Sequence, residues 1–216
     1  MHVNPSRGIV TIWGRANSVN VQKVLWCLDE IGLAYTRVDA GMAYGRNNEA
    51  DYLAVNPTGR IPTLVDGDFV LWESNAIMRY LVLAYGGATA LYPAEPALRG
   101  SIERWLDWTL STLQPAERPV FWGLVRTPPA ERDMAALQKD ADSVAKLWQI
   151  LDAHLEGRTF MEGDAFSLAD LALATYARRW FGVSGVAKPE LPQLARWYDR
   201  CSARQGFRRF VAPPLS

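Results

Sequence analysis

The N-terminal part of the chain shows two spacings of hydrophobic residues. Short apolar runs at Gly8–Trp13 and Tyr35–Val38 predict strands. Between them, apolar residues recur at helical spacing as far as Gly32, a residue type that commonly ends helices. Met42–Ala54 is polar and irregular, with a short helix predicted from Glu49. We therefore expect a strand-helix-strand unit whose two strands are parallel.

The next stretch predicts a loop, a hairpin and a helix. Asn56–Gly59 (Asn-Pro-Thr-Gly) is rich in turn formers. Thr63–Val65 and Phe69–Trp72 are short apolar runs on either side of Asp66-Gly67-Asp68, which favours a β-hairpin and an antiparallel edge to the sheet. Ser74 is a good N-cap for a helix that places apolar residues at helical spacing: Ile77, Leu81 and Tyr85.

Beyond Gly86-Gly87 only helical patterns remain. A stripe from Ile102 to Leu113 predicts a helix that ends around Pro115–Pro119, and Phe121–Arg126 predicts a shorter helical piece. Pro129 to about Glu156 predicts a long helix. Its apolar residues step by four and three alternately, which is typical of a coiled-coil-like seam: Leu137, Ala141, Val144, Trp148, Leu151 and Leu155.

A capping pattern marks the centre of this second half. Ser167 can cap a helix while Asp170, three residues on, reaches back to the N–H of the cap residue. The helix that follows is apolar nearly all round, so we expect it to be buried. Pro189–Pro192 begins another helix that continues through Cys201. These patterns predict residues 1–87 as an α/β domain, 88–97 as a linker and 98–216 as an all-α domain.

Composition narrows the possible roles. The chain has 216 residues, with 23 basic and 23 acidic side chains, which argues against a nucleic-acid partner. Its apolar runs are too short for a membrane span, and Met1–Gly8 lacks the apolar core of a signal peptide. Cys27 and Cys201 lie far apart, so we expect no metal site and no disulfide, in a cytoplasmic protein. His2 and His154 have no triad partner nearby in sequence.

Two features of residues 61–74 suggest chemistry. An X-Pro bond is the kind of peptide bond that adopts the cis form, and a cis bond at Pro62 would turn the N–H and C=O of Ile61 outward to pair with an extended peptide. The helix N-terminus at Ser74 is a natural seat for a carboxylate. Glu73, beside it, can accept from an ammonium. The segment therefore offers a slot for a peptide backbone beside a slot for an amino acid.

This set of motifs resembles the glutathione site of the glutathione transferase family. The shared features are Asn-Pro-x-Gly-x-x-Pro at residues 56–62, the hairpin, the Glu-Ser pair that opens a helix, and the Ser-x-x-Asp box. The resemblance extends over nearly the whole chain. It implies a thioredoxin-like N-terminal domain followed by an all-helical domain. It further implies glutathione as co-substrate, a role in detoxification, a small electrophilic substrate, and a homodimer.

The resemblance also assigns the residues that hold the tripeptide. The backbone of Ile61, before Pro62, would pair with the cysteinyl unit of glutathione. Glu73 and Ser74 would hold the γ-glutamyl ammonium and carboxylate. Arg60 stands where many relatives have a lysine near the site, and could meet the glycyl carboxylate. An exposed, solvated loop arginine is an equally good interpretation of Arg60.

The enzyme must also present a thiolate. A free thiol titrates at roughly pH 8.5, and one hydroxyl donor aided by a helix N-terminus supplies stabilisation of the right order. The donor should lie where the first strand leads into the first helix, so the candidates are Arg15, Asn17, Ser18 and Asn20. Ser18 stands where serine-type relatives place their catalytic hydroxyl, with Asn17 as the second choice. The alternative role of Ser18 is a plain N-cap of the first helix, and both roles can hold at once.

The acceptor site should lie on the first helices of the second half. Trp108, Trp122 and Trp180 supply aromatic area, although most tryptophans of this chain should belong to the core. Arg126 ends an apolar stretch, and with Arg15 in the facing loop it favours a small acidic electrophile. Arg126 could instead serve a helix C-terminus.

Two other functions remain open. A protein of this fold could bind glutathione or other ligands with little turnover. A glutathione-dependent reductase or peroxidase is disfavoured, because cysteine-type relatives carry their Cys in the first loop. Cys27 lies nine residues beyond Ser18, close to the apolar stripe of the helix, and is expected to be a packing residue.

Overall fold

The computed structural model describes residues 9–87 and 89–216. A four-stranded sheet has the order β2-β1-β3-β4, from β1 (Val10–Trp13), β2 (Tyr35–Val38), β3 (Thr63–Asp66) and β4 (Phe69–Trp72). β1 and β2 are parallel, whereas β3 is antiparallel to β1 and β4, so the predicted parallel unit and hairpin are confirmed. Three positions used in the predictions lie outside the described residues: Gly8 at the start of the first strand, His2, and Ala88 of the linker.

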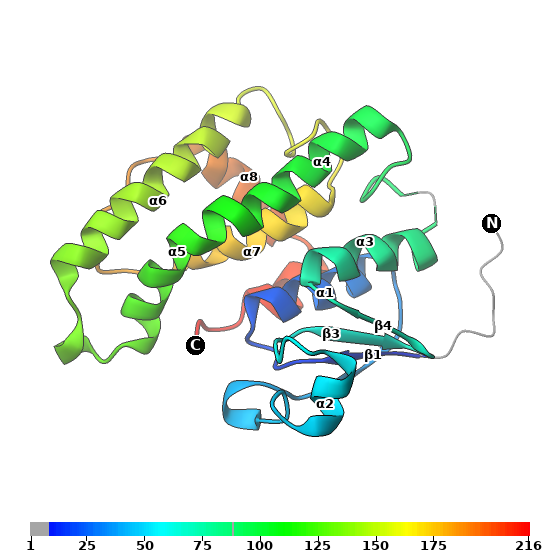
Figure 1. Ribbon diagram of the computed structural model, residues 1–216. Coiled ribbons are helices and arrows are strands. Elements are labelled where there is room, and N and C mark those ends of the chain that lie inside the picture. The colour runs from blue at the N-terminus through cyan, green and yellow to red at the C-terminus, as the bar shows by residue number, and fades with distance from the viewer. Residues whose placement is uncertain (1–8, 88) are drawn as a thin grey trace.

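Helices cover both sides of this sheet. α1 (Val19–Glu30) and α3 (Ser74–Tyr85) lie between the sheet and the rest of the molecule, while α2 (Ala50–Val55) lies on the opposite side (Figure 1). A 3₁₀ turn at Met42–Tyr44 precedes α2, whose start one residue after Glu49 confirms the predicted short helix. α1 packs on α3, so its buried apolar face joins the sheet to the helical half.

The helical half begins with a single path that stays helical through 31 residues and four consecutive segments: α4 (Pro96–Trp108), η2 (Thr109–Leu113), α5 (Gln114–Phe121) and η3 (Trp122–Arg126). The prediction that a helix ends around Pro115–Pro119 is therefore wrong. The turns η2 and η3 are π-helical, and Pro115 follows directly after the first of them. A π-helical turn is wider than an α-helical one, so it accommodates proline, which lacks an N–H and crowds the carbonyl four residues earlier.

The long helix is α6 (Met134–His154), which packs along α5 and runs antiparallel to it (Figure 1). It begins later than predicted, because a 3₁₀ turn at Pro129–Glu131 comes first and Asp133 caps the helix by accepting from the N–H of Ala136. Every apolar residue of the predicted seam is buried: Leu137, Ala141, Val144, Trp148, Leu151 and Leu155.

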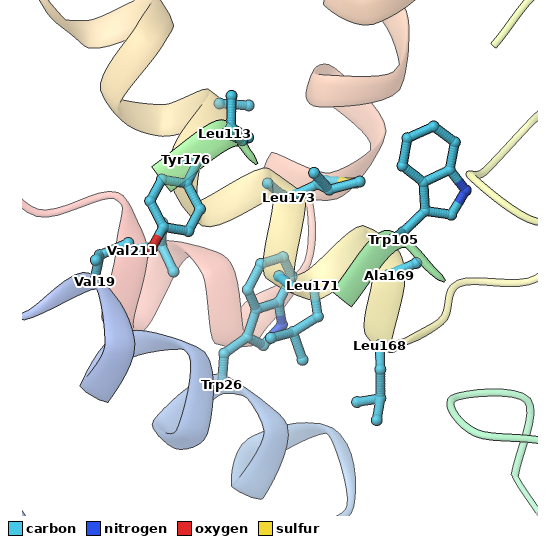
Figure 2. Packing of buried hydrophobic residues seen from close by; sticks show 14 of the residues in the cluster. Val19, Trp26, Trp105, Leu113, Leu168, Ala169, Leu171, Leu173, Tyr176 and Val211 are labelled. Atoms are coloured by element: carbon cyan, nitrogen blue, oxygen red, sulfur yellow. The ribbon is translucent and has the colours of Figure 1, made fainter. Parts of the chain in front are cut away.

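The buried centre is α7 (Leu168–Gly182), as predicted, and both hydrogen bonds of its capping box with Ser167 and Asp170 are present. α7 packs against α1, α3, α4, α5 and α8 (Pro192–Ser202), and the short π-helical turn η5 (Phe207–Val211) packs on α1 and α8. Figure 2 shows Trp26 of α1 near Leu171, and Tyr176 near Val19 and Val211. The two halves of the chain therefore share one continuous core.

Candidate active site

The loop before β3 is held by hydrogen bonds that are buried or half-buried. The Ile61–Pro62 bond is cis. The side-chain amide of Asn56 donates to the Arg60 carbonyl at 2.9 Å and to the Thr63 hydroxyl at 2.8 Å. The hydroxyl of Tyr52 on α2 donates to the same carbonyl at 2.6 Å. Sequence reasoning treated Asn56 only as a turn former, but its buried amide fixes the path of the loop on which Ile61 lies.

The start of α3 differs in one detail from the prediction. Glu73, not Ser74, occupies the N-cap position, with a φ of 70° and a ψ of 111°, so the prediction of Ser74 as the cap is wrong. An N-cap residue must have a non-helical backbone, and Ser74 is already the first helical residue. Its buried hydroxyl instead contacts the Asn20 amide oxygen of α1 at 3.4 Å. Because Ser74 lies in the first turn, its N–H is among the groups that lack an intrahelical partner and favour an anion.

A cavity of about 500 Å³ opens where these two segments meet the helical half. All five residues predicted to bind glutathione line it: Arg60, Ile61, Pro62, Glu73 and Ser74. The other lining residues come from α1, the loop, β4 and the η2–α5 path: Asn20, Asn56, Thr58, Trp72, Leu110, Gln114, Pro115 and Arg118. The structure therefore brings the two predicted slots together in one cavity, with the η2–α5 path as the opposite wall.

The candidate thiolate donors have distinct surroundings. Ser18 is the buried N-cap of α1, and its hydroxyl makes no capping hydrogen bond in the part of the chain that the structure describes. The exposed amide of Asn17 donates to the Ser216 hydroxyl at 2.7 Å, so the C-terminal segment already engages it. Asn20, one of the four candidates, is the one that lines the cavity. Arg15 belongs to a cluster of four arginines, with Arg118, Arg126 and Arg179.

This cluster joins the first loop to the second half of the chain. Burial lowers the pKa of Arg15, and the nearby charges of Arg126 and then Arg179 lower it further. Burial also lowers the pKa of Arg126, as do Arg179 and Arg118. The facing positions predicted for Arg15 and Arg126 are thus close enough to repel one another. Among the described residues, the buried Nε of Arg15 has no hydrogen-bond partner, which leaves a donor for a bound anion.

The cluster also contacts aromatic rings, one carboxylate and two other acceptors, because Arg126 donates to the Ser216 main-chain oxygen at 3.2 Å and to the Met42 sulfur at 3.4 Å. Arg118 and Arg126 both lie over the Trp122 ring, with their guanidinium carbons 5.3 and 4.5 Å from its centroid. Arg179 pairs with buried Glu117 at 3.0 Å. Glu117 pairs with one of the four arginines, Arg179, so the cluster is positive overall. Sequence reasoning missed Arg118 and Arg179, although Arg118 and Trp122 lie four residues apart on the same helical path as Arg126.

All five predicted acceptor residues lie outside the cavity lining: Arg15, Trp108, Trp122, Arg126 and Trp180. Trp180 is buried in the core, with its ring 6.5 Å from that of Trp148, and it does not line the cavity. Trp108 packs edge-on against Trp105 at 5.6 Å and is likewise outside the lining. Leu110 and Gln114 of the same path line the cavity instead. Indole rings supply large apolar area, and in this fold the core uses most of it.

The cysteines have the character expected of packing residues. Cys27 is fully buried in α1, and burial, followed by the charge of Glu30, raises the pKa of its thiol. Burial likewise raises the pKa of Cys201 well above its ordinary value. A protonated, inaccessible thiol is a poor nucleophile. This agrees with the interpretation of Cys27 as a packing residue.

Sequence reasoning missed one buried charged residue behind the cavity. Lys23 of α1 is fully buried, and its ammonium donates to the Asn75 side-chain oxygen of α3 at 2.9 Å. A signal was present in the sequence, because Lys23 stands four residues after Val19 and four before Cys27. All three therefore share one face of the helix, and the two flanking residues are buried.

The N-terminal half is a sheet with a cis-proline loop, the C-terminal half is all-helical, and the cavity lies between them. These features define a two-domain protein whose N-terminal half is thioredoxin-like. The chain belongs to the glutathione S-transferase family. The family model of the glutathione S-transferase N-terminal domain matches residues 9–82, and that of the C-terminal domain matches residues 107–205. The predicted family and fold class are thereby confirmed, and the protein is a glutathione transferase.

Individual relatives agree with this assignment. The chain is 43% identical over 210 residues to glutathione S-transferase GstB of Escherichia coli K12, covering 96% of this chain and 100% of that one. It is 34% identical to glutathione S-transferase 3 of Zea mays, covering 93% and 92%. The crystal structure of the theta class glutathione S-transferase of Xanthomonas axonopodis pv. citri with glutathione bound matches with a TM-score of 0.91 and 45% identity, covering 96% and 99%.

Two searches of the described residues bear on other partners. Every helix within residues 9–87 and 89–216 is too short or too polar to span a bilayer. In the same residues, no group of three or more His, Cys, Asp or Glu side chains is arranged to hold a metal ion.

Proposed function

We propose that this glutathione transferase binds glutathione in the cavity between the Ile61–Pro62 loop and the start of α3, and transfers its thiol to small electrophiles that carry an acidic group. The observation that carries the proposal is the shared cavity lined by Arg60, Ile61, Pro62, Glu73 and Ser74. The solved relative from Xanthomonas with glutathione bound, which matches over 96% of this chain, supports the same co-substrate.

Each part of glutathione has a partner of the right chemistry. The backbone of Ile61 pairs with the cysteinyl unit. Glu73 accepts from the γ-glutamyl ammonium, and the first turn of α3 at Ser74 receives the γ-glutamyl carboxylate, because helix N-termini favour anions. Arg60 meets the glycyl carboxylate. These groups hold the peptide through its backbone and termini, and leave the sulfur free to react.

Ser18 is the proposed donor to the thiolate. Ser18 is the N-cap of α1, so its hydroxyl lies at the positive end of a helix. Among the described residues, this hydroxyl makes no capping hydrogen bond. Asn20 is the second candidate, because it lines the cavity. Asn17 is a weaker one, since its amide already binds Ser216. The thiol proton passes to water, and the sulfur then attacks the electrophilic carbon. With a haloacid, a carbon–sulfur bond forms as the halide leaves with its electron pair.

The arginine cluster is the basis for an acidic substrate. Arg15 and Arg126 repel one another, and Arg179, the member of the cluster that pairs with Glu117, adds to the repulsion of both. An anion bound among them relieves this repulsion, whereas a neutral electrophile does not. Trp122, beneath two of the arginines, adds apolar area for the carbon skeleton of the substrate.

A matched pair of electrophiles tests the proposal. Glutathione is assayed with chloroacetate and with chloroacetamide, which differ in charge but little in size, and each kcat/KM is divided by the uncatalysed rate constant. We expect the normalised value to be about tenfold or more higher for the acid, the ratio that corresponds to about 1.4 kcal/mol. Equal values would contradict the acidic substrate class. Glutathione binding without turnover across these and chlorodinitrobenzene would favour the binding-protein alternative instead.

Two further proposals rest on the family. The protein forms a homodimer through α3 and α4, supported by exposed apolar side chains on these helices, Leu83 at 58% and Leu98 at 37%. Light scattering of the purified protein, with Leu83→Glu as the disrupting variant, tests this assembly. A cytoplasmic location follows from the same relationship, and fractionation of cells that express the protein tests it.

A further inference from the structure

Lys23 is a fully buried lysine directly behind the proposed glutathione site. It lies on the face of α1 that packs against α3 and α7, with no exposed surface. Its Nζ donates to the Asn75 side-chain oxygen at 2.9 Å and lies 5.9 Å from the centroid of the Tyr176 ring. Lysine is rarely buried to this extent unless a partner binds its amine. Asn75 is that partner, and the reason for burying a lysine here needs an explanation.

Asn75 also makes a hydrogen bond to the helical half. Its side-chain N–H donates to the backbone carbonyl of Leu106 on α4 at 2.9 Å, and both its side-chain hydrogen bonds are buried. The Lys23–Asn75–Leu106 bridge therefore joins α1, α3 and α4. Asn75 directly follows Glu73 and Ser74, so the bridge anchors the turn that carries both.

Stability alone does not account for a lysine at this position. Burial lowers the pKa of Lys23 to about 7, while Glu73 at the start of α3 raises it and Arg179 of α7 lowers it. Tyr176 of α7 faces the ammonium with its ring. An apolar side chain of similar length would avoid the desolvation of a charge, and such replacements are often neutral or stabilising. A residue that is unfavourable for stability is expected where function requires it.

We propose that Lys23 is a positioning residue for glutathione. Through Asn75, it holds the first turn of α3 against α4, so that Glu73 and the Ser74 N–H keep the geometry that the γ-glutamyl unit needs. This inference rests on the glutathione site proposed above. It concerns a residue outside the cavity lining, which acts on the ligand only through its neighbour. A small displacement of a binding group is enough to weaken a charge-assisted contact.

Two substitutions at one position separate the hydrogen bond from packing. Lys23→Met keeps the length and removes the donor, whereas Lys23→Gln keeps an N–H donor without the charge. Titration calorimetry gives the Kd for glutathione, and steady-state assays give KM and kcat. For Lys23→Met we expect Kd and KM for glutathione to rise about tenfold, the size of one charge-assisted hydrogen bond, with kcat within about twofold. Lys23→Gln should recover most of the lost affinity.

A matched control tests whether any change in α1 has the same effect. Val24→Ala removes a buried side chain next to Lys23 on the same helix. It should lower the Tm and leave the Kd for glutathione within about twofold, because only packing is lost. Lys23→Met should show the reverse: a Tm equal to or above that of the wild type, with weaker binding.

The outcomes distinguish this inference from the proposed site. If the wild type binds glutathione and Lys23→Met binds it equally well, Lys23 has no positioning role and the inference fails alone. The same follows if Lys23→Gln binds as weakly as Lys23→Met. If the wild type shows no binding, the proposed glutathione site fails and the inference with it. Should Lys23→Met not fold, Asn75→Ala cuts both bonds of the bridge, and unchanged affinity in that variant would also overturn the inference.

Discussion

The two walls of the cavity are built in different ways. The glutathione wall comes from one stretch of chain, residues 56–74, and two of its four proposed contacts, those of Ile61 and Ser74, come from backbone groups. The acceptor wall and the neighbouring arginine cluster combine side chains from the first loop, η2, α5, η3 and α7. Their members stand more than 160 positions apart in the sequence, from Arg15 to Arg179.

This difference explains which properties of each wall a substitution can change. A backbone slot depends on the path of the chain, which Tyr52, Asn56 and Thr63 fix by buried hydrogen bonds. The acceptor side depends on the side chains themselves, so one substitution alters its charge or shape without disturbing the fold. We therefore expect the co-substrate to be fixed by the architecture and the electrophile to be set by a few residues.

The largest effect should come from the proposed thiolate donor at the start of α1. Ser18→Ala should lower kcat/KM by about 10²-fold, as expected for loss of one positioned donor to a developing anion. The pKa of the bound glutathione thiol should rise toward its free value of roughly 8.5. The pH dependence of kcat/KM measures both, and Ser18→Thr, which keeps a hydroxyl, is the control. A larger loss in Asn20→Ala than in Ser18→Ala would transfer the role to Asn20.

The second effect concerns the stability of the glutathione wall as pH changes. Lys23 has a folded-state pKa of about 7, below its ordinary value of 10.5. Between these values the unfolded chain binds one proton more than the folded chain, so this group makes the free energy of unfolding rise with pH and makes it fall as pH drops toward 7. Urea denaturation from pH 7.5 to 9.5 should show a slope steeper in the wild type than in Lys23→Met by about 1.4 kcal/mol per pH unit. Identical slopes would contradict the lowered pKa of Lys23 in the folded chain.

The third effect tests the loop network. Asn56→Leu removes the two hydrogen bonds that the Asn56 amide donates to Arg60 and Thr63. Leaving buried partners unsatisfied should lower the free energy of unfolding by about 1–3 kcal/mol and raise KM for glutathione, with KM for the electrophile unchanged. Asn47→Ala is the matched control, because Asn47 donates to Gly59 of the same loop from a more exposed position. An equal effect of both substitutions would mean that the network has no special part in shaping the wall.

The smallest effect belongs to the acceptor side, and it should be selective. Arg126→Ala should raise KM for chloroacetate about tenfold and change KM for chloroacetamide by less than about twofold, because only the acid gains from the charge. Arg104→Ala removes a more exposed arginine, paired with Glu162, and should change neither. If Arg126→Ala raised both values equally, Arg126 would serve packing on Trp122 and not substrate charge.

Local sequence signals account for much of the fold. The strands, the hairpin, the Ser167–Asp170 box and the seam of α6 all follow from patterns within a few residues, and the structure has each of them. The signals failed where local and tertiary preferences disagree. Pro115 and Pro119 are read as helix breakers, yet the helical path continues through both: Pro115 follows the π-helical turn η2, and Pro119 lies inside α5. The turn at Phe207–Val211 gave no recognisable signal.

The sequence by itself determined the family, the order of elements and the five residues proposed to hold glutathione, because backbone recognition is encoded in one short stretch of turn, cis-proline and helix start. Only the tertiary structure decided which tryptophans belong to the core, that four arginines lie in one cluster, and that Lys23 is buried against Asn75. Those facts depend on which distant side chains meet across packed helices. Spacing along a chain does not carry that information.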